Sequence, residues 1–130
     1  MMYTEMGNNK KITSFTQLRA WAGGHQLVLE VYKLTKTFPA DERFALSDQL
    51  RRAIVSVTSN VAEGFSRNGK KEKVQFYAMA LGSLTETQNQ LLIARDLRYM
   101  GKEEFNKLAE KTVSVHKMIN GLIKSAQNRS

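Results

Sequence analysis

The sequence contains no cysteine, and this absence removes several classes of function at once. Without thiols the chain cannot build a disulfide framework, a thiolate metal site or a cysteine nucleophile. It also lacks an apolar run of about eighteen residues, the length that a membrane-spanning helix needs. The first residues, MMYTEMGNNKK, lack the apolar core of a signal peptide. We therefore expect a soluble, cytoplasmic protein with no role in a membrane.

Proline and glycine are scarce, with one proline and eight glycines in 130 residues. Long segments therefore run without a helix breaker, which favours helices over a strand-rich fold. Hydrophobic residues make up 42% of the chain, which is enough for one domain with a core of its own.

The segment 46–64 carries the clearest helical pattern. Its apolar residues recur at steps of three and four, which places them on one face of a helix. Ser47 and Asp48 lie where the free amides of a helix start need an acceptor, and Gly64 can adopt the left-handed conformation that ends a helix. The residues of the apolar face are Leu46, Leu50, Ala53, Ile54, Val57 and Val61.

Short or polar residues lie beside this apolar face rather than opposite it. They are Ser56, Ser59, Asn60 and Glu63. Small side chains let another helix approach closely, and a half-buried amide needs hydrogen-bond partners. The pattern indicates either a tight helix–helix contact or a recognition surface, and the sequence leaves both open.

The same spacing predicts three further helices, over 16–37, 71–99 and 102–126. Gly23 and Gly24 interrupt the first, so either that helix bends or a neighbouring segment needs the space. Phe44 is expected to fix the connector after Pro39 to the core. Gly101 is expected to end the third helix.

Four amphipathic helices joined by short links predict an all-α fold, an antiparallel up-down-up-down four-helix bundle. The bundle domain is expected over 15–126. Residues 1–14 are predicted to be a flexible N-terminal lead, and 127–130 a flexible C-terminal tail.

Several charged or amide side chains fall on or beside the predicted apolar faces. Such groups are costly unless they are paired, so a guanidinium there should reach for a carboxylate. Glu63 and Glu86 are the candidate carboxylates, and Arg52 with Glu86 is the pair proposed for a test by double mutation. The predicted structural polar network comprises Arg51, Arg52, Asn60, Glu63, Glu86 and Arg95.

Residues suited to catalysis are sparse. His25 and His116 lie far apart, and neither has the Glu-x-x-His or His-Glu-x-x-His spacing of a helical metal site. Glu63 and Glu86 could act as a carboxylate pair, but neutralisation of nearby arginines is the simpler explanation. The chain has no phosphate-binding loop and no Gly-x-Ser-x-Gly turn. We predict a non-enzymatic protein with no catalytic residue, metal or cofactor.

The charge balance points to a polyanion. The chain has 20 Lys and Arg against 12 Asp and Glu, a formal net charge of +8. Such an excess favours RNA or DNA as a partner, although it could also serve solubility alone. The predicted nucleic-acid-binding residues would contact phosphates with little sequence readout. They are Arg67, Lys70, Lys71, Lys73, Lys107, Lys111, Lys117 and Lys124. Because the few aromatics are assigned to the core, base stacking is not expected to dominate.

Several short motifs occur in a fixed order along the chain. They are Leu18-x-x-Trp21, Val31–Tyr32–Lys33–Leu34–Thr35, Phe38–Pro39, Leu46-x-x-Gln49–Leu50–Arg51–Arg52–Ala53, Ser56-x-x-x-Asn60-x-Ala62–Glu63–Gly64 and Gly82–Ser83–Leu84-x-Glu86. In these motifs the chain resembles the small four-helix-bundle proteins first noticed in intervening sequences of large-subunit ribosomal RNA genes. It is also similar to the accessory variability determinant proteins of diversity-generating retroelements.

The resemblance implies a bundle without known enzymatic activity that assembles into a homopentamer. In the retroelement members, the basic protein binds a reverse transcriptase and its template RNA. The partners implied for this chain are therefore further copies of itself, RNA and a reverse transcriptase. The alternative is a structural protein–protein interaction bundle with no nucleic-acid role.

Overall fold

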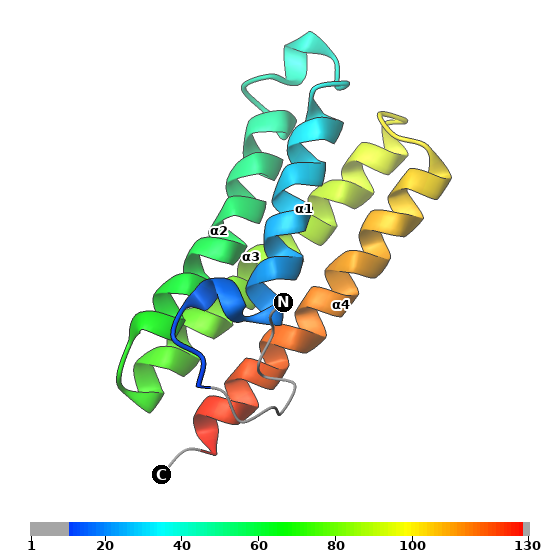
Figure 1. Ribbon diagram of the computed structural model, residues 1–130. Helices are drawn as coiled ribbons and strands as arrows, with labels where there is room; N and C mark the ends of the chain where they lie inside the picture. Colours follow the sequence, from blue (N-terminus) through cyan, green and yellow to red (C-terminus); the bar gives the residue numbers. More distant parts are fainter. Residues whose placement is uncertain (1–10, 129–130) are drawn as a thin grey trace.

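The computed structural model describes residues 11–128, and within them the chain forms four α-helices and no strand (Figure 1). The helices are α1 (Arg19–Thr35), α2 (Leu46–Ser66), α3 (Lys70–Asp96) and α4 (Lys102–Gln127). Two short 3-10 turns, η2 (Phe15–Gln17) and η3 (Ala40–Glu42), precede α1 and α2. Each helix runs antiparallel to the one before, and α4 packs back against α1 (Figure 1). The predicted up-down-up-down four-helix bundle is confirmed.

The core is built from the predicted apolar faces. Leu50, Ile54, Val57 and Val61 of α2 are completely buried, each with 0% of its surface exposed. Burying one such side chain contributes roughly 1.5–3 kcal/mol. This stripe therefore contributes far more than any single polar contact in the bundle.

The chain joins the bundle before α1 begins. Ile12 is half-buried and packs against the core, although residues 11–14 belong to the predicted flexible lead. Ser14 and Gln17 form a capping box, in which Gln17 Oε1 accepts hydrogen bonds from the amides of Thr13 and Ser14 at 2.8 and 3.1 Å. At the other end, Gln127 closes α4. Residues 1–10 of the lead and 129–130 of the tail lie outside the described residues.

The glycine pair in α1 makes room for neighbouring helices, and the helix runs through it without a break. A Cβ added at Gly24 would lie 3.0 Å from Thr58 Cγ2 on α2. One added at Gly23 would lie 3.1 Å from Val115 Cγ2 on α4. Of the two explanations that the sequence left open, close approach holds.

Several predictions about helix ends are wrong. Gly64 does not end α2, which continues to Ser66, because this glycine serves close packing against the ring of Tyr77. Gly101 precedes α4 as its N-cap and does not end α3. Ser47 is buried within the first turn of α2. The amide of Leu46 is instead capped by Glu42 Oε1 at 3.3 Å.

Phe44 also departs from its prediction. The side chain is 83% exposed, so it does not fix the connector to the core. That role falls to Phe38, which is 7% exposed and packs against the ring of Tyr99 at 5.3 Å between centroids. Phe44 is apolar, but it lies in a connector without a helical repeat. The sequence therefore does not tell whether its side chain faces the core or the solvent.

An arginine, Arg98, ends α3 in the left-handed conformation with φ of 66°. The amide of Arg98 bonds to the carbonyl of Arg95, and that of Tyr99 bonds to the carbonyl of Ala94. This pair of bonds is a Schellman motif, in which glycine normally occupies the left-handed position. A non-glycine residue there is strained by contact between its Cβ and the backbone.

We predict that Arg98→Gly stabilises the protein by about 1 kcal/mol, because glycine adopts this conformation without a Cβ contact. Urea denaturation of the variant and the wild type measures the difference. A loss of stability would mean that the arginine side chain makes a stabilising contact that outweighs the backbone strain.

Candidate nucleic-acid interface

Charge is distributed unequally along the bundle. We define the basic end as the half where α1 begins, α2 turns into α3 and α4 finishes (Figure 1). Within residues 11–128 it holds eight cations and two acids, Glu63 and Glu72, a net charge of +6. The opposite half holds ten cations and nine acids, a net charge of +1. The cations of the basic end are Lys11, Arg19, Arg67, Lys70, Lys71, Lys73, Lys117 and Lys124.

Lys70 and Lys71 are the first two residues of α3, and both are exposed. No side chain caps this helix start, whose N-cap is Gly69. The start of a helix carries a partial positive charge, so each cation there is unfavourable by roughly 0.3–1 kcal/mol. The first turn of α4 follows its one cation, Lys102, with two acids, Glu103 and Glu104, whereas that of α3 has a single acid, Glu72, after its two lysines. The two lysines therefore do not serve the stability of α3, and an anion would relieve their repulsion.

Lys73 has a structural role that differs from its predicted contact with nucleic acid. Its side chain is buried, with 7% of the residue exposed. Its Nζ donates hydrogen bonds to the carbonyls of Phe65 at 2.7 Å and Gly64 at 3.2 Å. These carbonyls belong to the last turn of α2, where backbone groups lack the regular helical partner, although that of Gly64 also accepts from the amide of Arg67 at 3.3 Å. Lys73 thus fastens the end of α2 to α3 and is withdrawn from the surface.

We predict that Lys73→Met lowers the free energy of unfolding by about 2 kcal/mol, since buried carbonyls lose a charged donor. Chemical denaturation of Lys73→Met beside Lys71→Met, an exposed neighbour on the same helix, measures this loss. Equal stability of the two variants would show that the buried ammonium contributes nothing.

The other predicted nucleic-acid-binding residues divide between the two halves. Lys117 and Lys124 are exposed and lie with Lys70 and Lys71 in the basic end. Arg67 also lies there, with its guanidinium bonded to Glu63 at 2.7 Å and placed 4.9 Å from the ring centroid of Phe76. Lys107 and Lys111 lie in the opposite half, where Lys111 pairs with Glu30 of α1 at 2.5 Å.

A pocket of about 590 Å³ opens at the basic end. Among the residues that the structure describes, no acid lines it, and the cations that line it are Lys11, Arg19 and Lys73. Sequence reasoning missed Lys11 because it falls in the predicted flexible lead, and Arg19 because it is an isolated cation beside an apolar stretch. Lys11 and Arg19 supply the positive charge at the pocket surface, because the ammonium of Lys73 is bonded to the carbonyls of Gly64 and Phe65.

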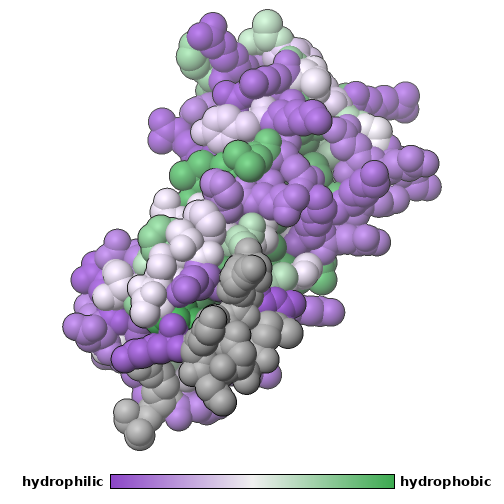
Figure 2. Space-filling model, viewed as in Figure 1, coloured by the Kyte–Doolittle hydropathy of each residue, from purple (hydrophilic) through white to green (hydrophobic). Residues whose placement is uncertain are grey.

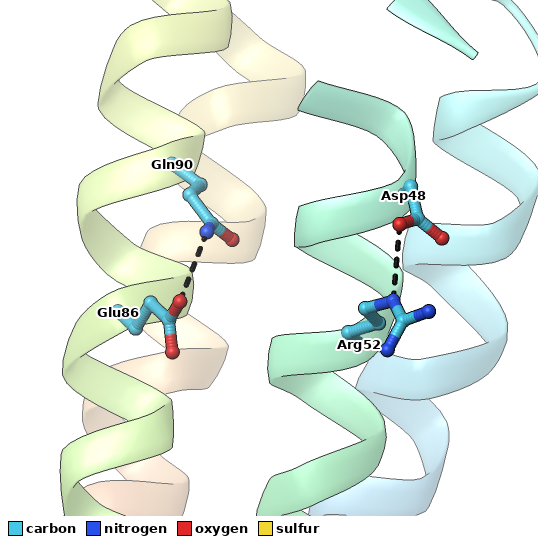
Figure 3. Close-up of polar contacts among 4 residues, drawn as sticks. All are labelled: Asp48, Arg52, Glu86 and Gln90. Atoms are coloured by element: carbon cyan, nitrogen blue, oxygen red, sulfur yellow. Dashed lines mark hydrogen bonds and ion pairs between the residues drawn. The ribbon is translucent and has the colours of Figure 1, made fainter. Parts of the chain in front are cut away.

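Within residues 11–128, the residues of the predicted polar network bond to other partners and not to one another. Arg52 Nε bonds to Asp48 Oδ2 at 3.0 Å, one turn away on α2. Glu86 Oε2 accepts from Gln90 Nε2 at 3.4 Å, one turn away on α3. Figure 3 shows the two contacts running along their own helices. The predicted Arg52–Glu86 pair is therefore wrong, because each side chain finds a closer partner at the i,i+4 spacing.

Two arginines of the predicted network, Arg51 and Arg95, contact neutral side chains or an exposed acid. Arg51 Nε donates to Thr35 Oγ1 at 2.7 Å, and its guanidinium lies 4.7 Å from the ring centroid of Tyr32. Arg95 pairs with the adjacent Asp96 at 2.9 Å and stacks over Phe105. These contacts tie α1 to α2 and α3 to α4.

Asn60 takes part in a small polar contact between α2 and α3. Its Nδ2 donates to the carbonyl and the hydroxyl of Ser56 at 2.9 and 3.1 Å. The hydroxyl of Ser83 on α3 donates to Ser56 Oγ at 2.9 Å. Ser56 therefore forms a helix–helix contact that Asn60 supports from the same helix, while Ser59 is exposed and Glu63 pairs with Arg67.

The two histidines lie in unrelated places. The ring of His25 stacks on Trp21 with centroids 4.6 Å apart, and His116 Nδ1 lies 3.1 Å from Asn120 Nδ2. Across residues 11–128, no three His, Asp or Glu side chains are grouped as a metal site would require. No helix in that range is long and apolar enough to cross a membrane.

Comparisons with known proteins give one family model and a similar solved structure. A family model described as 23S rRNA-intervening sequence protein matches residues 16–121. No curated protein matches the chain. A crystal structure of a protein of unknown function from the S23 ribosomal protein family of Bacteroides thetaiotaomicron superposes with a TM-score of 0.75. The two chains are 18% identical, and the match covers 81% of this chain and 95% of the other. At this identity the likeness shows a shared fold.

Proposed function

The chain belongs to the 23S rRNA-intervening sequence protein family, and from that premise we propose that it is a non-enzymatic RNA-binding accessory or scaffold protein. The observation that carries the proposal is the segregation of charge. The basic end holds eight cations and two acids, a net charge of +6. Charge kept for solubility alone would be spread over the surface, whereas phosphates are bound where cations gather.

The phosphate-contacting surface in this proposal comprises Lys70, Lys71, Lys117 and Lys124, with Lys11, Arg19 and Arg67 at its edges. Lys73 supports it from within. Lys107 and Lys111 are left out because acids of the opposite half surround them: Glu103, Glu104 and Glu110 on α4 and Glu30 on α1. Contacts of this type recognise the backbone and not the base sequence.

We further propose that the protein is a homo-oligomer, and the family resemblance suggests a pentamer. Two sets of exposed apolar residues, on different helices, support this. One lies over α1 and α2 and includes Tyr32 and Val55, which are 40% and 37% exposed. Figure 2 shows apolar residues gathered over the upper half of these helices. The other follows α3, where Met79 and Ile93 are 49% and 41% exposed. Contact between unlike surfaces of successive copies can close into a ring.

A reverse transcriptase is a further proposed partner, on the strength of the similarity to retroelement accessory proteins. The second candidate function is a protein-interaction bundle without RNA. The same exposed apolar surfaces favour it, since such surfaces mark protein contacts. The two functions differ in their dependence on salt.

RNA binding through the basic end is tested by fluorescence anisotropy with a labelled single-stranded RNA over a range of salt. Four to six phosphate contacts predict that affinity falls roughly a hundredfold between about 50 and 200 mM salt. Affinity that is independent of salt, or no binding at the lowest salt, would contradict the proposal and favour the protein-interaction bundle.

A further inference from the structure

The end of the bundle opposite the basic end carries exposed apolar side chains. Phe44 lies between η3 and α2 and is 83% exposed. Leu97 lies at the end of α3 and is 50% exposed. Neither position contributes much buried apolar surface to folding, although both carry large apolar residues.

The two segments that carry Phe44 and Leu97 are joined by a clamp. The hydroxyl of Tyr99 donates to Glu42 Oε2 at 2.7 Å, and Glu42 Oε1 accepts from the amide of Leu46 at 3.3 Å. The hydrogen bond to Glu42 raises the pKa of Tyr99 above its usual value. The hydrogen bond thus joins the connector to the α3–α4 turn at this end of the bundle.

Two arginines flank the apolar side chains. The guanidinium of Arg43 lies over the ring of Phe44, 5.0 Å from its centroid. Arg98 is exposed and holds the left-handed conformation that glycine would adopt without strain. Among residues 11–128, no carboxylate forms an ion pair with either arginine. Strain retained at an exposed charged residue points to a role outside folding.

The chemistry of this end favours a protein over RNA. Its half of the bundle has nearly balanced charge, with ten cations and nine acids, so it gives RNA little electrostatic attraction. Arginine and aromatic side chains are enriched at the centres of protein interfaces. Two arginines without an ion-pair partner beside apolar side chains are complementary to a segment that combines acids with a large apolar residue.

We propose that Arg43, Phe44, Leu97 and Arg98 form a docking site for an acidic protein segment that places an apolar side chain against Phe44 and Leu97. The site lies at the end remote from the proposed RNA surface. It depends on different residues, so either proposal can fail without the other.

A selection from a random peptide library displayed on phage tests the site, with the full-length protein immobilised. Peptides that combine Asp or Glu with aromatic or aliphatic residues should be enriched on the wild type. A synthetic peptide of the enriched sequence should bind Phe44→Ser and Arg43→Glu at least about tenfold more weakly. Val113→Ser, at an exposed apolar residue on the side of the bundle, is the matched control and should bind normally. Arg98→Gly should also weaken binding while raising the melting temperature.

Several outcomes would overturn the proposal. One is that the variants retain their melting temperature, yet no enriched peptide depends on Phe44. A second is that Phe44→Ser lowers affinity for a single-stranded oligoribonucleotide and leaves peptide binding unchanged, which would assign the site to RNA. A third is a change in molar mass by light scattering in Phe44→Ser, which would assign the surface to contact between copies of the chain.

Discussion

Replacing Lys70 and Lys71 together by glutamate is expected to lower the affinity for RNA roughly thirty- to a hundredfold at moderate salt. The double variant removes two favourable phosphate contacts and adds two repulsive ones at the centre of the proposed surface. Both side chains are exposed at the start of α3, where acids are favoured by the helix dipole. The variant should therefore fold at least as well as the wild type, and a loss of binding cannot be assigned to unfolding.

A matched variant separates position from total charge. Lys102 and Lys107 are exposed lysines in the first two turns of α4, in the half with balanced charge. Lys102→Glu with Lys107→Glu changes the net charge by the same amount as the first variant. We expect it to alter RNA affinity by no more than about threefold, since long-range effects are screened within about 10 Å. Equal losses in both double variants would show that total charge, and not the basic end, determines binding.

Gly64→Ala is expected to destabilise the bundle by about 2 kcal/mol. The added Cβ would lie 2.7 and 2.8 Å from two ring carbons of Tyr77, and 3.2 Å from Phe76 Cβ on the same helix. Tyr77 is buried, with 3% of its surface exposed, so its ring and the side chains packed on it must shift to admit the added Cβ. The last turn of α2 and the first half of α3 would have to move apart.

Urea denaturation measures the effect, with Gly82→Ala as the control. Gly82 also lies in a helix, but nothing stands within 4 Å of an added Cβ there. Alanine should therefore stabilise that position by about 1 kcal/mol through helix propensity alone. If Gly64→Ala were as stable as Gly82→Ala, the close contact between α2 and α3 would not hold in solution.

Helices were predictable from the sequence because their signal is local. Leu50, Ile54, Val57 and Val61 repeat with the period of a helix, and their burial follows from that repeat. The roles of Gly64 and Phe44 depend instead on their tertiary environment, that is, on which residues of other segments pack against them. Periodicity contains no information on the ring of Tyr77 or on the direction in which a connector turns its side chain.

Part of the candidate site was predictable for the same reason. Lys70 and Lys71 fall in a local cationic segment, so composition was sufficient to find them. That Lys107 lies far from this segment could be seen only from the arrangement of the helices in space. With a rise of 1.5 Å per residue, Lys107 and Lys124 lie about 25 Å apart along α4. The antiparallel topology, which was predicted, places only the second half of α4 beside the start of α3.

Lys73 shows a further limit of reading charge from sequence. It is two residues from Lys71, yet helical geometry turns it inward to the last carbonyls of α2. Its role depends on how α2 ends, which is the feature that sequence patterns predict least well. A cationic cluster in sequence can therefore contain both surface charges and a structural one.

Photo-crosslinking locates the RNA directly. The full-length protein is mixed with a single-stranded RNA containing 4-thiouridine, irradiated at low salt, and digested for mass spectrometry. We predict crosslinks in peptides from the end of α2, the start of α3 and the second half of α4, with few in the first half of α4. Crosslinks concentrated around Lys102–Lys111, or spread evenly along the bundle, would contradict a basic end that binds RNA.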